Sequence, residues 1–200
     1  MSTITRLSAQ KKDRSRVNIE VDGEFVTGLP LEEVVKQRLK VGQEVESSVL
    51  SSWKELDDKG KILGKVINFL SYRPRTTKEV TIRLNTYTED VGIKEYVMQY
   101  LGTHNLLDDL AFADWWVKSR QDTRSSRVLQ QELRLKGIDN TIIHQVLSPV
   151  SDRDALLTIL NKKGLNLDRA KLYRYCLGKG FSYDLVSQVF AELGIGAHLV

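Results

Sequence analysis

The sequence predicts a mainly helical protein, in which tandem three-helix repeats form an elongated, curved helical array after a small β-hairpin-containing N-terminal module. Three observations predict this fold. Alternation of apolar and polar residues with period two is confined to about the first 50 residues. From about residue 52 onward, apolar residues recur at spacings of three and four, which is typical of amphipathic helices. One apolar pattern in that helical part repeats after 49 residues and again after 43, a period typical of helical repeats.

The composition of the 200 residues, 41% hydrophobic and 28% charged, is that of a globular chain and excludes a collagenous, low-complexity or wholly disordered protein. No apolar run approaches the roughly 20 residues that a membrane-spanning helix needs. The N-terminus lacks the apolar core of a signal peptide, and the single cysteine, Cys176, cannot form an internal disulfide. We therefore expect a protein of the reducing cytoplasm.

The N-terminal module, predicted over residues 1–51, is defined by a hairpin signal. Residues 16–21 alternate apolar and polar side chains, Asp22-Gly23 follows, and a second short segment occupies residues 24–27. An Asp-Gly pair between two strands predicts a two-residue turn, because both turn positions favour positive φ. Around this hairpin we expect a third strand, a short helix that begins after Pro30, and a further strand, at residues 4–9, 31–39 and 45–50 respectively.

Signals for the start of a helix recur along the rest of the chain. In four places an apolar residue precedes an Asp or Ser, and a second apolar residue follows four positions after it. This arrangement is typical of a helix N-cap with a hydrophobic staple. The four predicted N-caps are Asp108, Asp139, Asp168 and Ser182. Residues 76–79 and 151–154 are capping-box candidates, so we expect many short helices.

The apolar pattern that repeats is centred on Leu84, Leu133 and Cys176. An apolar residue lies four positions before each of these residues, and two more lie 9 and 13 positions after it. The flanking residues are Val80, Ile93 and Val97, then Leu129, Ile142 and Val146, then Leu172, Leu185 and Val189. The second and third occurrences also carry a Lys-Gly turn, at 136–137 and 179–180, where glycine is typical of a helix C-cap. We therefore expect three-helix repeats over residues 52–103, 104–149 and 150–200.

The positive charge is spread over separate helices, so any anion-binding surface has to be assembled by the fold. Lys and Arg number 30 against 26 Asp and Glu, a net charge of +4, and no segment is a basic tail. Basic residues nevertheless cluster at matching helix junctions of the repeats. They are Arg73, Arg75 and Lys78 in the first, Lys118, Arg120, Arg124, Arg127, Arg134 and Lys136 in the second, and Arg169, Lys171 and Arg174 in the third. Because arginine binds phosphate and carboxylate alike, the sequence leaves open whether these residues contact DNA, an acidic protein or only solvent.

The aromatic residues of the second repeat favour a structural role. Phe112, Trp115 and Trp116 could stack on nucleic-acid bases, but helical periodicity favours a core face, with Trp115 as the exposed ring. The residues expected on that core face are Leu110, Phe112, Ala113, Trp116 and Val117.

The sequence shows no arrangement of catalytic or metal-binding residues. Asp108-Asp109 lacks a third nearby carboxylate and is better explained as helix capping. Cys176 occupies a core position of the repeat, and the segment 178–180 lacks the spacing of a phosphate-binding loop. The histidines, which lack an accompanying nucleophile and acid, are His104, His144 and His198. We therefore expect no catalytic residue, no metal and no cofactor.

Four segments of the helical part carry a pattern that is specific in combination. They are residues 73–80 (Arg-Pro-Arg-Thr-x-x-Glu-Val), 106–120 (Leu-Leu-Asp-Asp-x-x-Phe-Ala-x-x-Trp-Val-x-x-Arg), 129–138 (Leu-x-x-Glu-Leu-x-x-Lys-Gly-Ile) and 172–181 (Leu-x-x-Tyr-x-x-x-Lys-Gly-Phe). Together they resemble the RecX family of bacterial RecA regulators over about residues 55–195. The N-terminal module is similar to an extension that many Gram-positive members carry.

Three positions depart from the pattern of that family. Thr76 stands where the family has Ser, and Ser125 or Ser126 stands where it has Gly. The turn of the first repeat, residues 89–92, lacks the Lys-Gly pair. These departures concern the alignment of the first repeat rather than the resemblance as a whole.

The resemblance implies a non-catalytic regulator that binds in the groove of the RecA–DNA filament. Such a protein modulates, most often by inhibition, the recombinase, ATPase and coprotease activities of RecA. The implied partners are RecA and single-stranded DNA, and the implied context is DNA repair, DNA recombination and the SOS response. The implied state is a monomer whose binding to DNA by itself is weak or moderate. An alternative is a stand-alone DNA- or RNA-binding helical protein, because three-helix units resemble helix-turn-helix domains.

Overall fold

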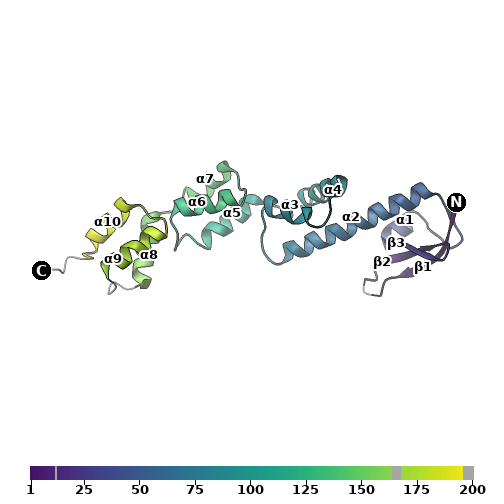
Figure 1. Cartoon of the computed structure of the whole chain (residues 1–200), viewed down its shortest axis with the longest axis horizontal. Helices are drawn as coiled ribbons and strands as arrows, with labels where there is room; N and C mark the ends of the chain where they lie inside the picture. The colour runs from purple at the N-terminus through teal and green to yellow at the C-terminus, as the bar shows by residue number, and fades with distance from the viewer. Residues whose placement is uncertain (12, 164–167, 196–200) are drawn as a thin grey trace. The chain divides into compact units, whose positions relative to one another are not determined.

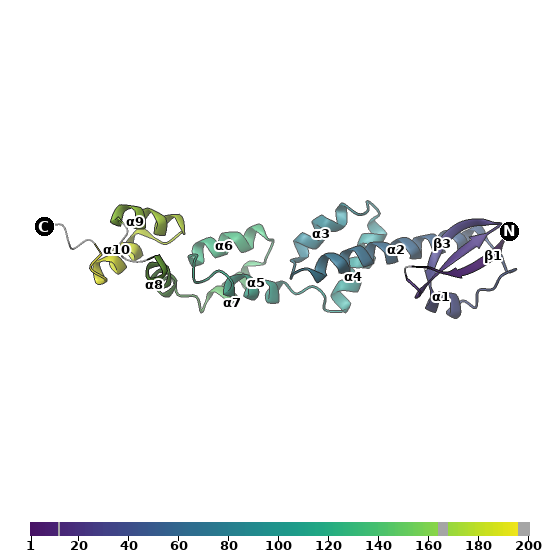
Figure 2. The same cartoon turned by 90° about the horizontal axis from the view of Figure 1, so that it is seen from below.

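The computed structural model describes residues 1–11, 13–163 and 168–195, and Figures 1 and 2 show the order of its elements. The strands are β1 (Ser2–Ala9), β2 (Arg16–Val21), β3 (Glu24–Pro30) and β4 (Glu44–Val45). The helices are α1 (Leu31–Lys36), α2 (Ser47–Ser71), α3 (Thr77–Asn85), α4 (Val91–Thr103), α5 (Asp109–Lys118), α6 (Ser126–Leu135), α7 (Asn140–Leu147), α8 (Asp152–Lys163), α9 (Arg169–Gly178) and α10 (Tyr183–Glu192). The fold is mainly helical, as predicted, and among the described residues strands occur only in the N-terminal module.

The four strands form one antiparallel sheet in the order β3-β2-β1-β4. β3 pairs with β2 along the whole of β2, which confirms the predicted hairpin. The turn between them has a φ of 52° at Asp22 and 86° at Gly23, the left-handed conformation that an Asp-Gly turn favours. The third predicted strand is β1, and the short helix that begins after Pro30 is α1.

The strand predicted over residues 45–50 is wrong. Strand β4 ends at Val45, and α2 begins at Ser47. The physical reason is an apolar spacing of three and four, which turns one face of a helix toward the core of the sheet module. The residues with this spacing are Val49, Leu50, Trp53 and Leu56.

A buried carboxylate joins α2 to the hairpin of the sheet. Asp57, only 3% exposed, accepts hydrogen bonds from the Thr27 hydroxyl at 3.0 Å and from the Gly28 backbone N–H at 3.2 Å. It also forms ion pairs with Lys61, at 2.8 Å, and with Arg16. Burial by itself would raise the pKa of Asp57, but these partners outweigh it, so the carboxyl pKa is lowered and the group stays ionised.

The repeating apolar pattern lies in the core at most of its positions. Its members on the second helix of each repeat are buried: Val80 and Leu84 in α3, Leu129 and Leu133 in α6, and Leu172 and Cys176 in α9. One position is displaced, because Ile142 and Leu185 are only half-buried. Their neighbours Ile143 and Val186 are fully buried instead, since each is the fourth residue after an N-cap and belongs to a hydrophobic staple.

All four predicted N-caps are confirmed. Each side chain accepts a hydrogen bond from a backbone N–H of its own first turn: Asp108 from Ala111, Asp139 from Thr141, Asp168 from Ala170, and Ser182 from Leu185. The two capping-box candidates act in the same way, Thr76 accepting from Glu79 and Ser151 from Asp154. The sequence signals therefore determine where these helices begin.

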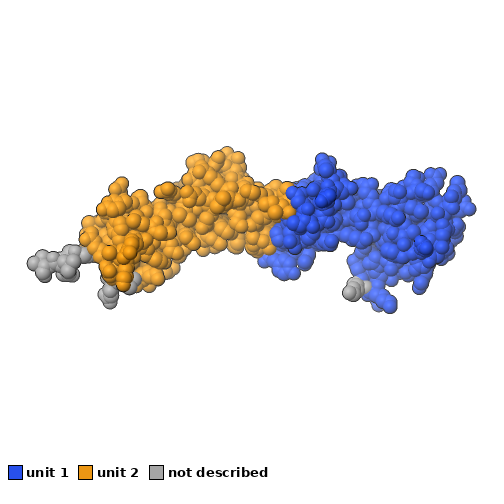
Figure 3. Space-filling view, in the orientation of Figure 1, with its two compact units in different colours: residues 1–72, 83–104 blue, residues 73–82, 105–200 orange. Residues whose placement is uncertain are grey.

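The described residues form two compact units, which Figure 3 colours separately. The first comprises residues 1–72 and 83–104, so it contains the sheet together with most of the first repeat. The second comprises residues 73–82 and 105–200, and it contains the second and third repeats. None of the described helices combines the length and the apolar composition of a membrane-spanning helix.

Leu133 tests the predicted repeat. Its side chain is fully buried in the core of the second repeat, so Leu133→Ala is expected to lower the free energy of unfolding by about 2–5 kcal/mol. Leu135 lies on the same helix but is 78% exposed, so Leu135→Ala is expected to change it by less than about 0.5 kcal/mol. Urea denaturation followed by circular dichroism measures both variants, and equal effects would show that the repeat is misaligned.

Candidate interaction surface

The first and second repeats are joined at the start of α3. The Thr76 hydroxyl donates a hydrogen bond to the backbone carbonyl of Lys136 at 2.9 Å. The backbone N–H of Thr77 donates to a carboxylate oxygen of Asp109 at 2.8 Å. The N-terminus of α3, the second helix of the first repeat, therefore contacts the C-terminus of α6, the second helix of the second repeat. The carboxylate of Asp109 in α5 completes the contact.

The same contact recurs between the second and third repeats. The backbone N–H of Ser125 donates to the carbonyl of Lys179 at 3.2 Å, and that of Ser126 donates to Asp152 at 2.6 Å. We call this recurring contact the inter-repeat clasp. Its two copies comprise Thr76, Thr77, Asp109, Lys136 and Gly137, and then Ser125, Ser126, Asp152, Lys179 and Gly180.

The clasp requires glycine after the lysine. Gly137 and Gly180 have positive φ, 82° and 93°, and a Cβ on Gly180 would lie 2.3 Å from a Val128 methyl carbon. A Cβ on Gly137 would likewise lie 2.8 Å from the Cβ of Lys78. The first repeat has no preceding repeat to contact, because the strands come before it in the chain. It therefore does not need the Lys-Gly pair.

Three of the predicted basic residues are committed to the clasp of the first two repeats. Arg73 binds Glu79 through both terminal nitrogens, at 3.0 and 3.2 Å, and Lys136 binds the same carboxylate at 2.5 Å. Burial alone would raise the pKa of Glu79, but the hydrogen bonds and charges of the two cations outweigh it and lower the pKa to about 2. The Lys78 ammonium donates to the carbonyl of Leu135 at 3.1 Å.

The ring of Trp116 is covered and is not available for base stacking. The Arg120 guanidinium lies 3.5 Å from its centroid, Phe112 stacks on it at 5.6 Å, and its indole N–H donates to Glu132 at 2.8 Å. Trp115 is 38% exposed, as predicted. Leu110 is also 38% exposed, so its predicted place on the core face is wrong; it lies two residues before Phe112, on a different side of the helix.

The remaining basic residues divide into two groups. Lys118 forms an ion pair with Asp114 at 2.6 Å, Arg134 and Arg174 donate hydrogen bonds within or near their own helices, and Arg75 is half-buried. The side chains of the second group make no hydrogen bond and no ion pair with any other residue that the structure describes. We call this group the unpaired cations: Arg124, Arg127, Arg169 and Lys171.

The unpaired cations lie where a helix dipole disfavours positive charge. Arg127 is in the first turn of α6, and Arg169 and Lys171 are in the first turn of α9. Neither of these first turns contains an acidic residue. Because a helix N-terminus carries partial positive charge, cations there reduce helix stability rather than increase it. The helix dipole therefore does not account for their placement.

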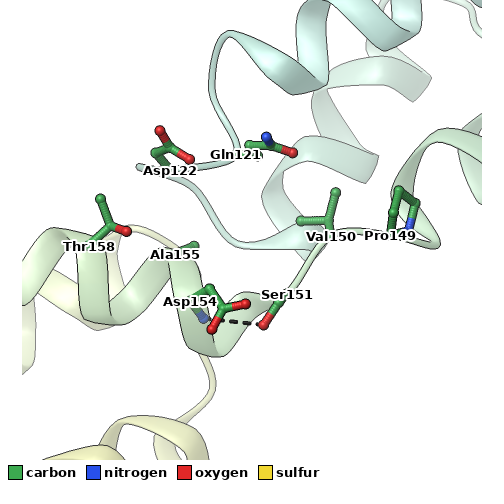
Figure 4. Close-up of a pocket in the computed structure, with 8 residues that line it drawn as sticks. All are labelled: Gln121, Asp122, Pro149, Val150, Ser151, Asp154, Ala155 and Thr158. Carbon is green, nitrogen blue, oxygen red and sulfur yellow. Dashed lines mark hydrogen bonds between the residues drawn. The ribbon is translucent and has the colours of Figure 1, made fainter.

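Concavities of opposite charge surround the second repeat. One, of about 380 Å³, lies between α6 and α7 and contains no carboxylate; it is lined by Ser126, Arg127, Gln130, His144, Leu147, Ser148 and Val150. Another, of about 170 Å³, carries the carboxylates of Asp122 and Asp154, as the close-up in Figure 4 shows. A third contains Asp108 and Asp114. Of these three, only the first suits an anion.

The other residues considered for catalysis or metal binding have structural roles or surroundings that do not suit chemistry. Asp108 and Asp109 each accept a hydrogen bond from a backbone N–H, and Cys176 is buried, which raises its pKa to about 11 and leaves the thiol unreactive. His104 stacks on Tyr100 at 3.9 Å, and His198 lies outside the described residues. In the part of the chain that the structure describes, no three His, Cys, Asp or Glu side chains converge as a metal site.

Comparison with known proteins shows which family this chain is similar to. Family models match the RecX N-terminal domain over residues 2–46 and the second three-helix domain of RecX over residues 108–147. The regulatory protein RecX of Bacillus licheniformis is 34% identical, over 96% of this chain and 78% of that protein. The chain belongs to the RecX family. Regulatory protein RecX of Bacillus subtilis is 31% identical over the same shares of the two chains.

Solved structures of the RecX family share the fold. A crystal structure of regulatory protein RecX superposes with a TM-score of 0.72 at 23% identity, over 94% of this chain and 98% of that one. RecX from Lactobacillus salivarius gives a TM-score of 0.56 at 28% identity, over 69% and 97%. The matched second three-helix domain corresponds to α5, α6 and α7, the helices that carry Arg127 and the α6–α7 depression.

Sequence reasoning missed two features of this surface. His144 and Gln130 join Arg127 only through the packing of α6 on α7, and no local pattern marks them. The carboxylates of the clasp, Asp109 and Asp152, did leave a signal, because they are separated by the same 43 residues as the two Lys-Gly pairs.

Gly180 provides a test of the clasp. Gly180→Ala is expected to lower the free energy of unfolding by at least about 2 kcal/mol, because the new Cβ has to adopt a left-handed conformation and meets Val128. The matched control is Gly178→Ala on the same helix, where a Cβ meets nothing within 4 Å and is expected to be neutral or stabilising. Thermal unfolding distinguishes the two, and a tolerated Gly180→Ala would refute the requirement for glycine.

Glu79 provides a second test, through pH. The folded-state pKa, about 2, lies below the ordinary value of 4.5, so the stabilisation by the carboxylate is complete above about pH 5 and is lost as the pH falls toward 2. Glu79→Gln is therefore expected to cost about 2–3 kcal/mol at pH 7 and progressively less in acid. Glu55→Gln, at an exposed pair with Lys59, is the control, with no more than about 0.5 kcal/mol expected. A pH-independent difference for Glu79→Gln would contradict this assignment.

Proposed function

We propose that this chain is a non-catalytic regulator that binds the RecA filament on DNA and modulates its recombinase, ATPase and coprotease activities, most often by inhibition. Membership of the RecX family along nearly the whole chain supports this proposal. The proposal includes a monomer that acts in the cytoplasm, in DNA repair, recombination and the SOS response, with single-stranded DNA present in the complex.

One observation carries the proposal from the family to particular residues. The unpaired cations occupy the first turns of α6 and α9, or in the case of Arg124 the residue before the N-cap, where they do not stabilise the helix. Residues that break a local stability rule without compensation within the fold are expected at functional sites. We therefore place the filament-facing surface at Arg124, Arg127, Arg169 and Lys171.

Because cations recur in two repeats, individually weak contacts can together bind a partner. The second and third repeats both present cations in the first turn of their second helix, so one chain can contact two similar groups on a repeating partner. Linking such contacts raises the overall affinity without any single strong contact. The guanidinium groups suit both DNA phosphates and RecA carboxylates, and the salt dependence of binding distinguishes these two partners.

The test removes two of the unpaired cations together. Arg124→Ala with Arg127→Ala is expected to fold as the parent does, because neither side chain forms an ion pair with a described residue, and to weaken inhibition of RecA strand exchange. If the partners are phosphates of single strands, each lost contact should also reduce the slope of log affinity against log salt by about 0.7. The charge-matched control is Arg14→Ala with Lys40→Ala, two exposed positions of the N-terminal module.

Unchanged inhibition by the Arg124→Ala, Arg127→Ala variant would place the filament-facing surface elsewhere. A pull-down against RecA filaments on single-stranded DNA tests the partner itself. Retention on filaments but not on DNA alone supports the proposal. Equal, tight retention on DNA or RNA without RecA would instead favour a stand-alone nucleic-acid-binding protein.

A further inference from the structure

The depression between α6 and α7 combines several hydrogen-bond donors in one concavity. Arg127 and Gln130 come from successive turns of α6, and His144 and Ser148 come from α7 and its end. The volume is about 380 Å³, and no carboxylate is among the residues that line it. Arg127 makes no ion pair with a described residue, so its guanidinium has both of its terminal nitrogens available.

No carboxylate lines the depression, so a protonated His144 has no acidic partner there. Arg127 faces it from α6. On α8, Asp152 accepts the backbone N–H of Ser126 at 2.6 Å and is thereby committed to the inter-repeat clasp. On α5, Asp108 and Asp114 line a separate concavity with other residues of α7. An anion that enters the α6–α7 depression therefore meets no carboxylate among the residues that line it.

The ligand chemistry follows from these donors. A guanidinium offers two parallel N–H groups, a protonated imidazole offers a second charge, and an amide adds a neutral donor, a set that matches the oxygens of a phosphate. The depression is shallow, and small-molecule sites usually bury most of their ligand. A chain that runs across the surface and places one phosphate in the depression fits this shape better than a small molecule does.

We propose that the α6–α7 depression binds a backbone phosphate of DNA, with Arg127 and His144 as the charged donors and Gln130 as the neutral one. This inference deepens the proposed function, on which it rests, by naming the chemical group that Arg127 contacts. It also predicts that DNA binding strengthens in mild acid, because protonation of an imidazole adds a charge at the site.

The experiment uses the full chain and naked DNA, without RecA. Fluorescence anisotropy of a labelled 20-nucleotide oligothymidylate is measured at pH 5.8 and pH 7.8, at fixed ionic strength. The parent is expected to bind about two- to fivefold more tightly at the lower pH, the range of an exposed ion pair. His144→Gln should remove that difference, and Arg127→Ala should weaken binding at both pH values and reduce the salt slope by about 0.7.

Matched controls separate the site from general charge. His104→Gln changes a histidine that stacks on Tyr100 and is not among the residues that line the depression, so it should keep the pH effect of the parent. Arg14→Ala removes an exposed arginine from the N-terminal module and should bind DNA as the parent does. The inference is wrong if Arg127→Ala behaves like Arg14→Ala, or if the pH effect survives in His144→Gln.

Two competitors identify the source of the anion. Inorganic phosphate should displace the oligonucleotide no better than potassium chloride of equal ionic strength; stronger, saturable displacement that depends on His144 would indicate a site for free phosphate and overturn the assignment to DNA. Polyglutamate tests a protein carboxylate: binding that depends on Arg127 and His144, without a matching effect on DNA, would also overturn it. RecA inhibition by Arg127→Ala is measured in parallel. Weakened inhibition together with DNA binding equal to that of the parent refutes this inference without refuting the proposed function.

Discussion

The contact between successive repeats depends on a glycine that ends a second helix in the left-handed conformation. At Gly137 and Gly180 the missing Cβ leaves room for the start of the preceding second helix to approach the cap. The backbone carbonyl of the lysine before each glycine and a carboxylate of the next first helix then accept hydrogen bonds from that helix start. Two helix ends, which would otherwise leave unsatisfied polar groups, satisfy one another. The starts of α3 and α6 are thus held by a backbone carbonyl and a carboxylate of the following repeat.

This clasp also determines which basic residues are available to a partner. Arg73 and Lys136 neutralise Glu79 within the fold, and Arg120 covers the ring of Trp116. Their charges serve the stability of the second compact unit. The cations that remain are at the starts of α6 and α9, and the helix dipole there adds to their positive potential. A protein with a net charge of only +4 therefore concentrates positive potential at particular helix starts.

Positive and negative groups are also separated among the concavities around the second repeat. No carboxylate lines the depression between α6 and α7, whereas the concavity beside α5 and the one in Figure 4 contain carboxylates. Neighbouring concavities of the second compact unit therefore favour ligands of opposite charge. This separation allows a small unit to orient itself on a partner that carries both signs of charge.

The sequence by itself determined the local structure: the Asp-Gly hairpin, the N-caps at Asp108, Asp139, Asp168 and Ser182, and the period of the buried positions. Each of these depends on interactions among residues a few positions apart, which a sequence pattern records directly. It also showed which residues are basic, but not which of them are available. Glu79 lies 57 residues from Lys136, and His144 lies 17 residues from Arg127, so only the packing of helices brought these groups together. The same reason explains the failed strand at residues 45–50, because a core that forms over the whole module decided in favour of a helix.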